Sequence, residues 1–303
     1  MKIAIAGATG FVGSRLVEQL QTQGHQITIL TRNPQQASSR FPQAQVVGYN
    51  PFKSGEWQKS ISGCDAVVNL AGEPIAEKRW TPAQKQSILE SRQLGTEKIV
   101  EAIALAEVKP QVLVNASAIG YYGTSETAKF DETSQAGTDF LAEVCSKWET
   151  TAASVTASGT RSVILRFGIV LGEKGGALGK MLAPFSAFVG GPIGSGKQWF
   201  SWIHRDDVVK LIQMAIENPQ MEGVYNATAP NPATMSEFTQ TLGAVMSRPS
   251  WLPVPDFALE ALLGEGAIVV LQGQQVLPTR TLAQGFIFDY PTLQPALTAI
   301  LKG

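Results

Sequence analysis

The stretch Met1-Lys-Ile-Ala-Ile-Ala-Gly7-Ala-Thr-Gly10-Phe-Val-Gly13 decides the fold. Alternating apolar residues ahead of the first glycine indicate a buried strand, and apolar residues at helical spacing follow the last glycine. Gly7 permits a tight turn, Gly10 leaves room for a pyrophosphate, and Gly13 lets the helix pack closely on the strand. The free N–H groups at the start of that helix favour an anion. The stretch therefore predicts a dinucleotide-binding strand–turn–helix unit.

Strand and helix patterns alternate after this unit. Strands are expected near 26–30, 66–70, 112–115 and 162–166, and helices near 82–106 and 140–158. This alternation predicts an α/β fold with a Rossmann-type, doubly wound parallel sheet, whose ligands lie at the carboxyl ends of the strands. We assign residues 1–168 to an NADP-binding Rossmann domain, which a strand near 224–227 could rejoin. Residues 169–303 are assigned to a smaller, substrate-covering part, with a C-terminal small domain from about residue 249.

The end of the second strand indicates which dinucleotide binds. An acidic residue about 20 positions past the glycines would bind the ribose hydroxyls of NAD(H). The chain instead has Thr31-Arg32-Asn33-Pro34 there. A guanidinium suits a 2′-phosphate, because it can donate two hydrogen bonds to it, so NADP(H) is favoured over NAD(H). The alternative is that Arg32 is an ordinary solvated surface arginine.

Composition restricts the classes of function. The chain has 303 residues, of which 44% are hydrophobic, a net charge of −1 and two cysteines. We expect a soluble globular protein without nucleic-acid binding, because no cationic field is present. No apolar run is long enough to cross a bilayer and no leader is expected ahead of the first strand, so a cytoplasmic location is predicted. Cys64 and Cys145 show no metal-ligand spacing, and neither a metal site nor a disulfide framework is expected.

Several stretches resemble the extended short-chain dehydrogenase/reductase and sugar-nucleotide epimerase group over most of the chain. They are Gly7–Gly13, Asn69–Gly72, Ala118–Gly123, Leu165–Gly168 and Trp202–Asp207. Further stretches are similar to an atypical, epimerase-like subfamily with a small C-terminal domain of unknown function, namely Trp80, Glu90–Arg92, Phe140–Cys145, Gly190–Gly196 and Pro278–Arg280. Some members of that subfamily have been described as cell-division inhibitors.

The resemblance and the glycine motif together imply a set of NADP(H) contacts, in which Arg92 would reach the cofactor phosphates from the long helix. The expected cofactor-binding residues are Gly7, Thr9, Gly10, Phe11, Val12, Gly13, Thr31, Arg32, Leu70, Ala71, Gly72, Arg92, Arg166 and Gly168.

The chain departs from the group at the catalytic pair, which is normally Tyr-x-x-x-Lys assisted by Ser or Thr. The pair is expected about 20 residues after Tyr122-Gly123. That count reaches Glu143, with Lys147 four residues later, so the tyrosine is missing. Glu143 could act as an acid or base if burial raised its pKa. The favoured alternative is a solvated salt bridge between Glu143 and Lys147 at helical spacing, with Lys147 still able to contact ribose hydroxyls.

Other proton donors follow the strand near 112–115. Ser117, Tyr121 and Tyr122 are candidates, because they come directly after a strand end where substrate would lie. The alternative for the two tyrosines is stacking on the nicotinamide or packing.

His204 is one of two histidines and precedes Arg205-Asp206-Asp207. A structural role is favoured, in which Asp206 or Asp207 caps the following helix and His204 orients the corner.

Two hypotheses of different kinds remain. The first is an NADP(H)-dependent oxidoreductase or epimerase without the usual Tyr-x-x-x-Lys pair, acting as a monomer or homodimer on an unknown small substrate. The second is a catalytically degenerate NADPH-binding regulatory or interaction protein with a partner in cell division.

Overall fold

Seven parallel strands form the central sheet, in the order β11-β7-β5-β4-β1-β2-β3. The computed structural model describes residues 1–173 and 175–302. The strands are β1 (Lys2–Ala6), β2 (Gln26–Thr31), β3 (Gln45–Gly48), β4 (Ala66–Asn69), β5 (Val112–Ala118), β7 (Arg161–Phe167) and β11 (Gly223–Ala227). The order reverses between β1 and β4, which is where doubly wound sheets bind their ligands. The predicted Rossmann-type fold is confirmed.

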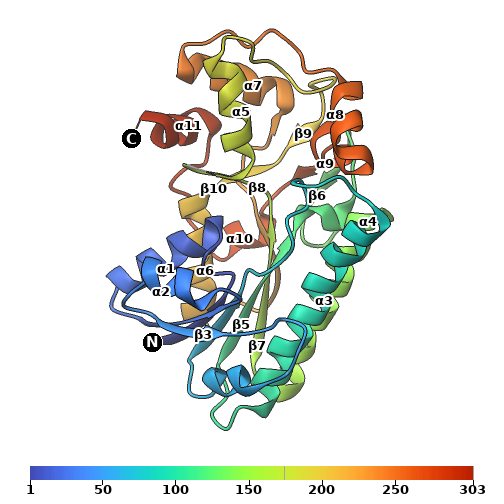
Figure 1. Cartoon of the computed structure of the whole chain (residues 1–303). Helices are drawn as coiled ribbons and strands as arrows, with labels where there is room; N and C mark the ends of the chain where they lie inside the picture. The colour runs from blue at the N-terminus through green and yellow to red at the C-terminus, as the bar shows by residue number, and fades with distance from the viewer. Residues whose placement is uncertain (174, 303) are drawn as a thin grey trace.

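Helices cover both faces of the sheet (Figure 1). One face carries α1 (Phe11–Thr22), α2 (Pro34–Arg40) and α6 (Arg205–Glu217), and the other carries α3 (Pro82–Leu105), α4 (Phe140–Ala153), η1 (Glu56–Ile61) and η3 (Ser154–Ser158). Side chains alternate along β1, so Ile3 and Ile5 enter the core beneath α1 and α6 while Ala4 and Ala6 face the core beneath α3. Burial on both faces explains why the strands are almost continuously apolar.

A smaller part lies beyond the carboxyl ends of the strands, with α5, α7 and α11 grouped at the top of Figure 1. Its core joins Trp202, Phe238 and Leu297. Its elements are β8 (Ile169–Leu171), α5 (Gly176–Ser186), β9 (Trp199–Phe200), β10 (Trp202–His204), β12 (Ala233–Thr234), α7 (Met235–Met246), α8 (Asp256–Leu263), η4 (Gly264–Ala267), α9 (Ile268–Leu271), β13 (Gln275–Val276) and α11 (Leu293–Lys302). The short helix α10 (Thr279–Ala283) instead packs against β11 of the main sheet. The chain returns to the main sheet for α6 and β11 between these elements.

The segment that leads from β5 to α4 joins the two parts. It contains η2 (Ile119–Tyr122) and β6 (Lys129–Phe130), and β6 pairs in parallel with β13. Next to this pairing, the Ser125 N–H donates to the Gly273 carbonyl at 2.9 Å, and the Thr124 hydroxyl donates to Gln272 Oε1 at 2.7 Å. These contacts hold residues 272–276 against the main sheet's carboxyl edge.

The start of α6 differs from the expectation. His204 itself is the N-cap, because its Nδ1 accepts from the Asp206 N–H at 3.1 Å. Asp206 instead pairs with Arg15 at 2.8 Å, and the Asp207 carboxylate accepts the backbone N–H groups of Asp289 and Tyr290. The expectation that an aspartate caps this helix was therefore wrong, since both carboxylates are engaged by distant residues.

Within residues 1–173 and 175–302, none of the helices combines the length and the hydropathy that crossing a bilayer requires.

Candidate functional site

The loop between β1 and α1 fits only glycine at two positions. Gly7 has a φ of +81°, and a Cβ there would lie 2.7 Å from the Leu70 carbonyl carbon. A Cβ on Gly13 would lie 2.2 Å from the Gly7 carbonyl oxygen, so the helix could not approach the strand. Gly10 is the N-cap of α1 and offers no side-chain acceptor to the first turn. The N–H groups of that turn are therefore left for an anion.

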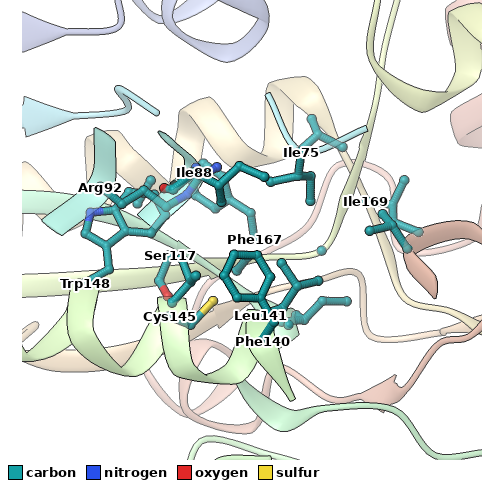
Figure 2. A pocket seen from close by; sticks show the side chains of 18 of the residues that line it. Ile75, Ile88, Arg92, Ser117, Phe140, Leu141, Cys145, Trp148, Phe167 and Ile169 are labelled. Atoms are coloured by element: carbon teal, nitrogen blue, oxygen red, sulfur yellow. Dashed lines mark hydrogen bonds between the residues drawn. The ribbon is translucent and has the colours of Figure 1, made fainter. Parts of the chain in front are cut away.

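A cavity of about 810 Å³ extends from this loop, past the end of β5, to the C-terminal part. Several predicted cofactor residues line it, namely Gly7, Gly10, Phe11, Val12, Gly13, Leu70, Arg92 and Gly168. Ser117 lines it as well, and Figure 2 shows this serine between Arg92 and Leu141 among the labelled side chains.

The other predicted cofactor residues lie outside the lining of the cavity. The register between β1 and β2 places Ala6 beside Leu30, so Thr31 and Arg32 follow at the level of the glycine turn. Arg32 is exposed there. The remaining residues outside the lining are Thr9, Ala71, Gly72 and Arg166.

A second arginine reaches the same end of the site and was not predicted. Arg40, at the end of α2, donates from Nη1 to the Thr9 carbonyl at 3.2 Å. It lies eight residues after Arg32, in a helix whose sequence carries no nucleotide-binding pattern. Only the tertiary packing of α2 brings it to the glycine loop.

Arg92 is a cation held at the cavity wall by neutral groups. Its Nη1 donates to the carbonyl oxygens of Glu73 and Ile88 at 3.0 and 3.2 Å, and the guanidinium lies 5.1 Å from the Trp148 ring centroid. Burial lowers the pKa of Arg92. No carboxylate of the described residues lies within 4.0 Å of it. A desolvated guanidinium of this kind is well suited to a phosphate.

Arg166 belongs to a buried network behind the cavity. Its Nε and Nη2 donate to the two carboxylate oxygens of Glu149 at 2.8 and 2.7 Å, and its Nη1 donates to the Tyr122 hydroxyl at 2.9 Å. That hydroxyl donates to Asn226 Oδ1 at 2.7 Å, and the Ser117 hydroxyl donates to Glu149 Oε1 at 2.6 Å. The structure thus brings Arg166 to Glu149 and Tyr122 and does not bring it to the cavity.

Of the three candidate proton donors, only Ser117 lines the cavity. Tyr122 is buried, and this burial raises its pKa to about 12. The Tyr121 ring stacks on the Arg166 guanidinium, with 3.3 Å between the guanidinium carbon and the ring centroid. Both tyrosine side chains therefore contact Arg166, which belongs to the buried network behind the cavity.

Glu143 and Lys147 lie on the solvent side of α4. Lys147 Nζ donates to Glu143 Oε1 at 2.6 Å, and the two side chains are 44% and 56% exposed. Neither residue lines the cavity. The structure places the pair as a solvated salt bridge, the alternative favoured above.

The cavity side of α4 carries different residues. Asp139 caps the helix by accepting the Ala142 N–H at 2.9 Å, and from this start Leu141 and Cys145 face the cavity on successive turns. Figure 2 shows Cys145 beside Ser117. Burial raises the pKa of the Cys145 thiol to about 11, which keeps it neutral. The residue count from Tyr122 missed Cys145, and apolar periodicity along α4 was the signal that could have found it.

The far half of the cavity is an apolar chamber. Apolar side chains from the loop after β4, from α3, α4, β8 and α9 form its walls, namely Ile75, Trp80, Ile88, Phe140, Leu141, Val144, Ile169, Ile268 and Val269. Lys85 Nζ bonds to Glu265 at 2.8 Å and so joins α3 to η4 across this chamber. Within the described residues, no group of three His, Cys, Asp or Glu side chains is placed to hold a metal.

The sequence profile described as "NAD dependent epimerase/dehydratase family" matches residues 3–228. The chain belongs to this family. A second profile, "Domain of unknown function (DUF1731)", matches residues 254–300. The chamber is therefore built from both matched regions, because Ile268 and Val269 belong to the second.

Two similar proteins match this chain over its whole length. It is 52% identical to the "Epimerase family protein SDR39U1 homolog, chloroplastic" of Arabidopsis thaliana, covering 100% of this chain and 87% of the relative. The structure of human epimerase family protein SDR39U1 (isoform 2) with NADPH is 38% identical and superposes with a TM-score of 0.92, covering 100% of both chains.

A more distant structure shares the fold alone. It is the UDP-glucuronic acid 4-epimerase of Bacillus cereus in complex with UDP-glucuronic acid and NAD, at 16% identity and a TM-score of 0.80, covering 99% of this chain and 98% of that one.

Proposed function

We propose that this protein binds NADP(H) in the cavity and exchanges hydride with a small substrate, as an oxidoreductase or epimerase. The residues fit the cofactor, since the loop accepts no Cβ at Gly7 or Gly13 and leaves the first turn of α1 open for a pyrophosphate. Arg92 supplies a cation that lacks a carboxylate partner among the described residues, and Arg32 is exposed at the end of β2, where a 2′-phosphate would lie. The NADPH in the human relative supports the same choice.

The observation that carries the proposal is the chamber beyond the dinucleotide half. A protein that only senses a cofactor needs no second space, whereas this cavity continues past Ser117 to walls formed by α4 and α9. Concave, mostly apolar cavities with a few convergent polar groups are typical of small-molecule sites. The chamber therefore favours an enzyme with a second ligand.

Different groups would perform hydride transfer, exclusion of water and proton transfer. A nicotinamide held in this cavity would supply or accept the hydride. Trp80, Leu141 and Ile268 exclude water from the chamber. When a substrate alcohol is oxidised, the Ser117 hydroxyl, which donates to Glu149 Oε1 at 2.6 Å, can take the alcohol proton while its own proton passes to the ionised carboxylate. In the reverse direction Glu149 first takes up a proton from solvent, and Ser117 passes it to the substrate oxygen. Ser117 takes the place of the absent tyrosine in this proposal.

The test begins with calorimetric titration of the protein with NADPH, NADP⁺ and NADH, and continues with a screen for NADPH oxidation by carbonyl compounds. We expect NADPH to bind with preference over NADH and to be oxidised by a member of the screen. Ser117→Ala should lower kcat about 100-fold or more, while NADPH affinity stays within about twofold. Ser154→Ala, at the exposed end of α4, is the matched control and should leave kcat unchanged.

Tyr121→Phe and Tyr122→Phe separate the proton donors. Both rings lie outside the lining of the cavity, so each variant should retain kcat. If Tyr121→Phe lost turnover but still bound NADPH, Tyr121 would be the proton donor and the role proposed for Ser117 would be wrong.

The rival function is a regulatory NADPH-binding protein that has lost hydride chemistry and acts on a partner in cell division. The observation in its favour is that α4 presents Leu141 and Cys145 to the cavity, and that no tyrosine or lysine of this helix lines it. NADPH binding without oxidation by any carbonyl compound, together with a cofactor-dependent change in partner binding, would support it.

A further inference from the structure

We propose that the substrate is an uncharged, largely apolar carbonyl compound, or the corresponding alcohol, and not a sugar joined to a nucleoside diphosphate. This inference rests on the proposed function, because it names the substrate class of the same cavity. Three features of the chamber carry it, namely its walls, its charges and its polar groups.

The walls of the chamber are apolar and partly aromatic. Trp80 and Phe140 meet edge to face, with 5.2 Å between ring centroids, and Ile268 packs against the same cluster from α9. Figure 2 shows Ile75 from the loop after β4, Ile88 from α3, and Phe140 and Leu141 from α4 around this part of the cavity. Walls of this kind stabilise a ligand by removing its apolar surface from water, so ligands with rings and alkyl groups bind more tightly.

The charges of the cavity do not suit a diphosphate in the chamber. Among the described lining residues the cations are Lys85 and Arg92. Lys85 is paired with Glu265 at 2.8 Å and lies 4.8 Å from the Phe140 ring centroid, while Arg92 stands beside Gly72 in the dinucleotide half. A diphosphate placed in the chamber would therefore lose its hydration without gaining a cation.

Most of the polar side chains around the chamber already make a hydrogen bond within the protein. Gln274 Nε2 donates to the Ile119 carbonyl at 2.8 Å, and Trp199 Nε1 donates to the Glu126 carbonyl at 2.8 Å. The Ser201 hydroxyl donates to the Gln274 carbonyl at 2.8 Å, and Thr124 bonds to Gln272 at 2.7 Å. A sugar with several hydroxyl groups would leave some of them unpartnered, whereas a single carbonyl oxygen needs one donor, which the Ser117 hydroxyl can supply by turning from Glu149.

The experiment measures binding and turnover separately on the full chain with saturating NADPH. The probes are 4-phenyl-2-butanone for the apolar class and UDP-glucose for the sugar nucleotides. Binding is followed by calorimetry, and turnover by NADPH oxidation. We expect the ketone to bind at least about tenfold more tightly than UDP-glucose, which corresponds to about 1.4 kcal/mol.

Two wall variants test where the probe binds. Ile268→Gln places an amide in the wall and should weaken ketone binding about tenfold, with NADPH affinity unchanged. Ile287→Gln is the matched control, because Ile287 is 75% exposed and does not line the cavity. If Ile268→Gln fails to fold, Val269→Thr adds a hydroxyl at nearly constant volume and should act in the same direction.

The outcomes separate this inference from the proposed function. Ketone binding that depends on Ile268, without NADPH oxidation, supports the apolar ligand class and contradicts hydride transfer. Tighter binding of UDP-glucose, with or without turnover, overturns the inference. Binding of neither probe to the NADPH complex also overturns it, as does ketone binding that Ile268→Gln and Val269→Thr leave unchanged.

Discussion

Glu149 of α4 and Arg166 of β7 form a buried ion pair with two parallel hydrogen bonds of 2.8 and 2.7 Å. Their side chains are 9% and 4% exposed. Glu149 also accepts a hydrogen bond from the Ser117 hydroxyl. The ion pair therefore holds in place a serine that lines the cavity. The pair therefore connects the stability of the sheet to the geometry of the site.

Removal of the Glu149 charge should be strongly destabilising. Glu149→Gln leaves a buried guanidinium without its counter-charge, and we expect a loss of about 3–5 kcal/mol in the free energy of unfolding. Glu143→Gln is the matched control on the same helix, where a solvated pair should cost less than about 1 kcal/mol. Urea denaturation of the two variants checks both values, and similar losses would contradict a structural role for the pair.

Arg92→Met should separate cofactor affinity from stability. The variant keeps an apolar stem but removes the cation, so NADPH affinity should fall by about 1.5–3 kcal/mol, roughly 10- to 100-fold. The free energy of unfolding should change little, because the relief of desolvation offsets two lost bonds to carbonyl oxygens. Calorimetry and urea denaturation measure the two quantities. Lys98→Met, on α3 but outside the lining, is the control, and an equal loss of NADPH affinity there would contradict a phosphate contact at Arg92.

Arg32→Asp tests the choice between the two nicotinamide cofactors. We expect NADPH affinity to fall about tenfold or more while NADH affinity changes little, because only NADPH carries the 2′-phosphate. Lys59→Asp removes another exposed cation, in η1, and should spare both affinities. If Arg32→Asp lowered the affinities for NADPH and NADH equally, the guanidinium would not be recognising the 2′-phosphate.

The stability of the fold should decrease in mild acid because of His204. Burial lowers the pKa of this cap to about 4, against about 6.5 for an unfolded histidine. A lowered folded-state pKa means that the contribution is complete above pH 6.5 and is lost as pH falls towards 4, up to about 3 kcal/mol. His204→Asn keeps a cap acceptor without the titration, so its unfolding free energy should depend less on pH in this window.

Denaturation of the parent and the variant between pH 4 and pH 7 measures that dependence. His25→Asn removes the other histidine of the chain, near Met1, and is the matched control. If the two variants respond alike, burial of His204 is not the cause.

Local patterns were enough to predict the sheet and the glycine loop. Gly7 and Gly13 are required by contacts with residues close by in the sheet, and strand–helix alternation fixes the order of the first strands. These features depend on short-range rules, so the sequence carries them directly.

The register of α4 could not be predicted in this way. The residue count assumed a fixed length between Tyr122 and the catalytic helix, but the segment between them is held by β6, which pairs with β13 far along the chain. The helix begins where Asp139 caps it, and this start turns Cys145 inward and Glu143 outward. The position of this cap therefore decides which side chains of α4 face the cavity.

The role of Arg166 was missed for a related reason. Its partner Glu149 belongs to a helix on the sheet's face, and no spacing rule links the two positions. Only the packed structure shows that the charge of Arg166 is neutralised internally.

The division of the cavity between two regions of the chain has an evolutionary consequence. The glycine loop and Arg92 lie in one region, whereas α9 adds its wall from the other. In the proposed enzyme, substitutions in α9 would alter the choice of substrate without changing the residues that hold the dinucleotide. Selection on α9 could therefore diversify the substrates of such proteins while the same dinucleotide cofactor is kept.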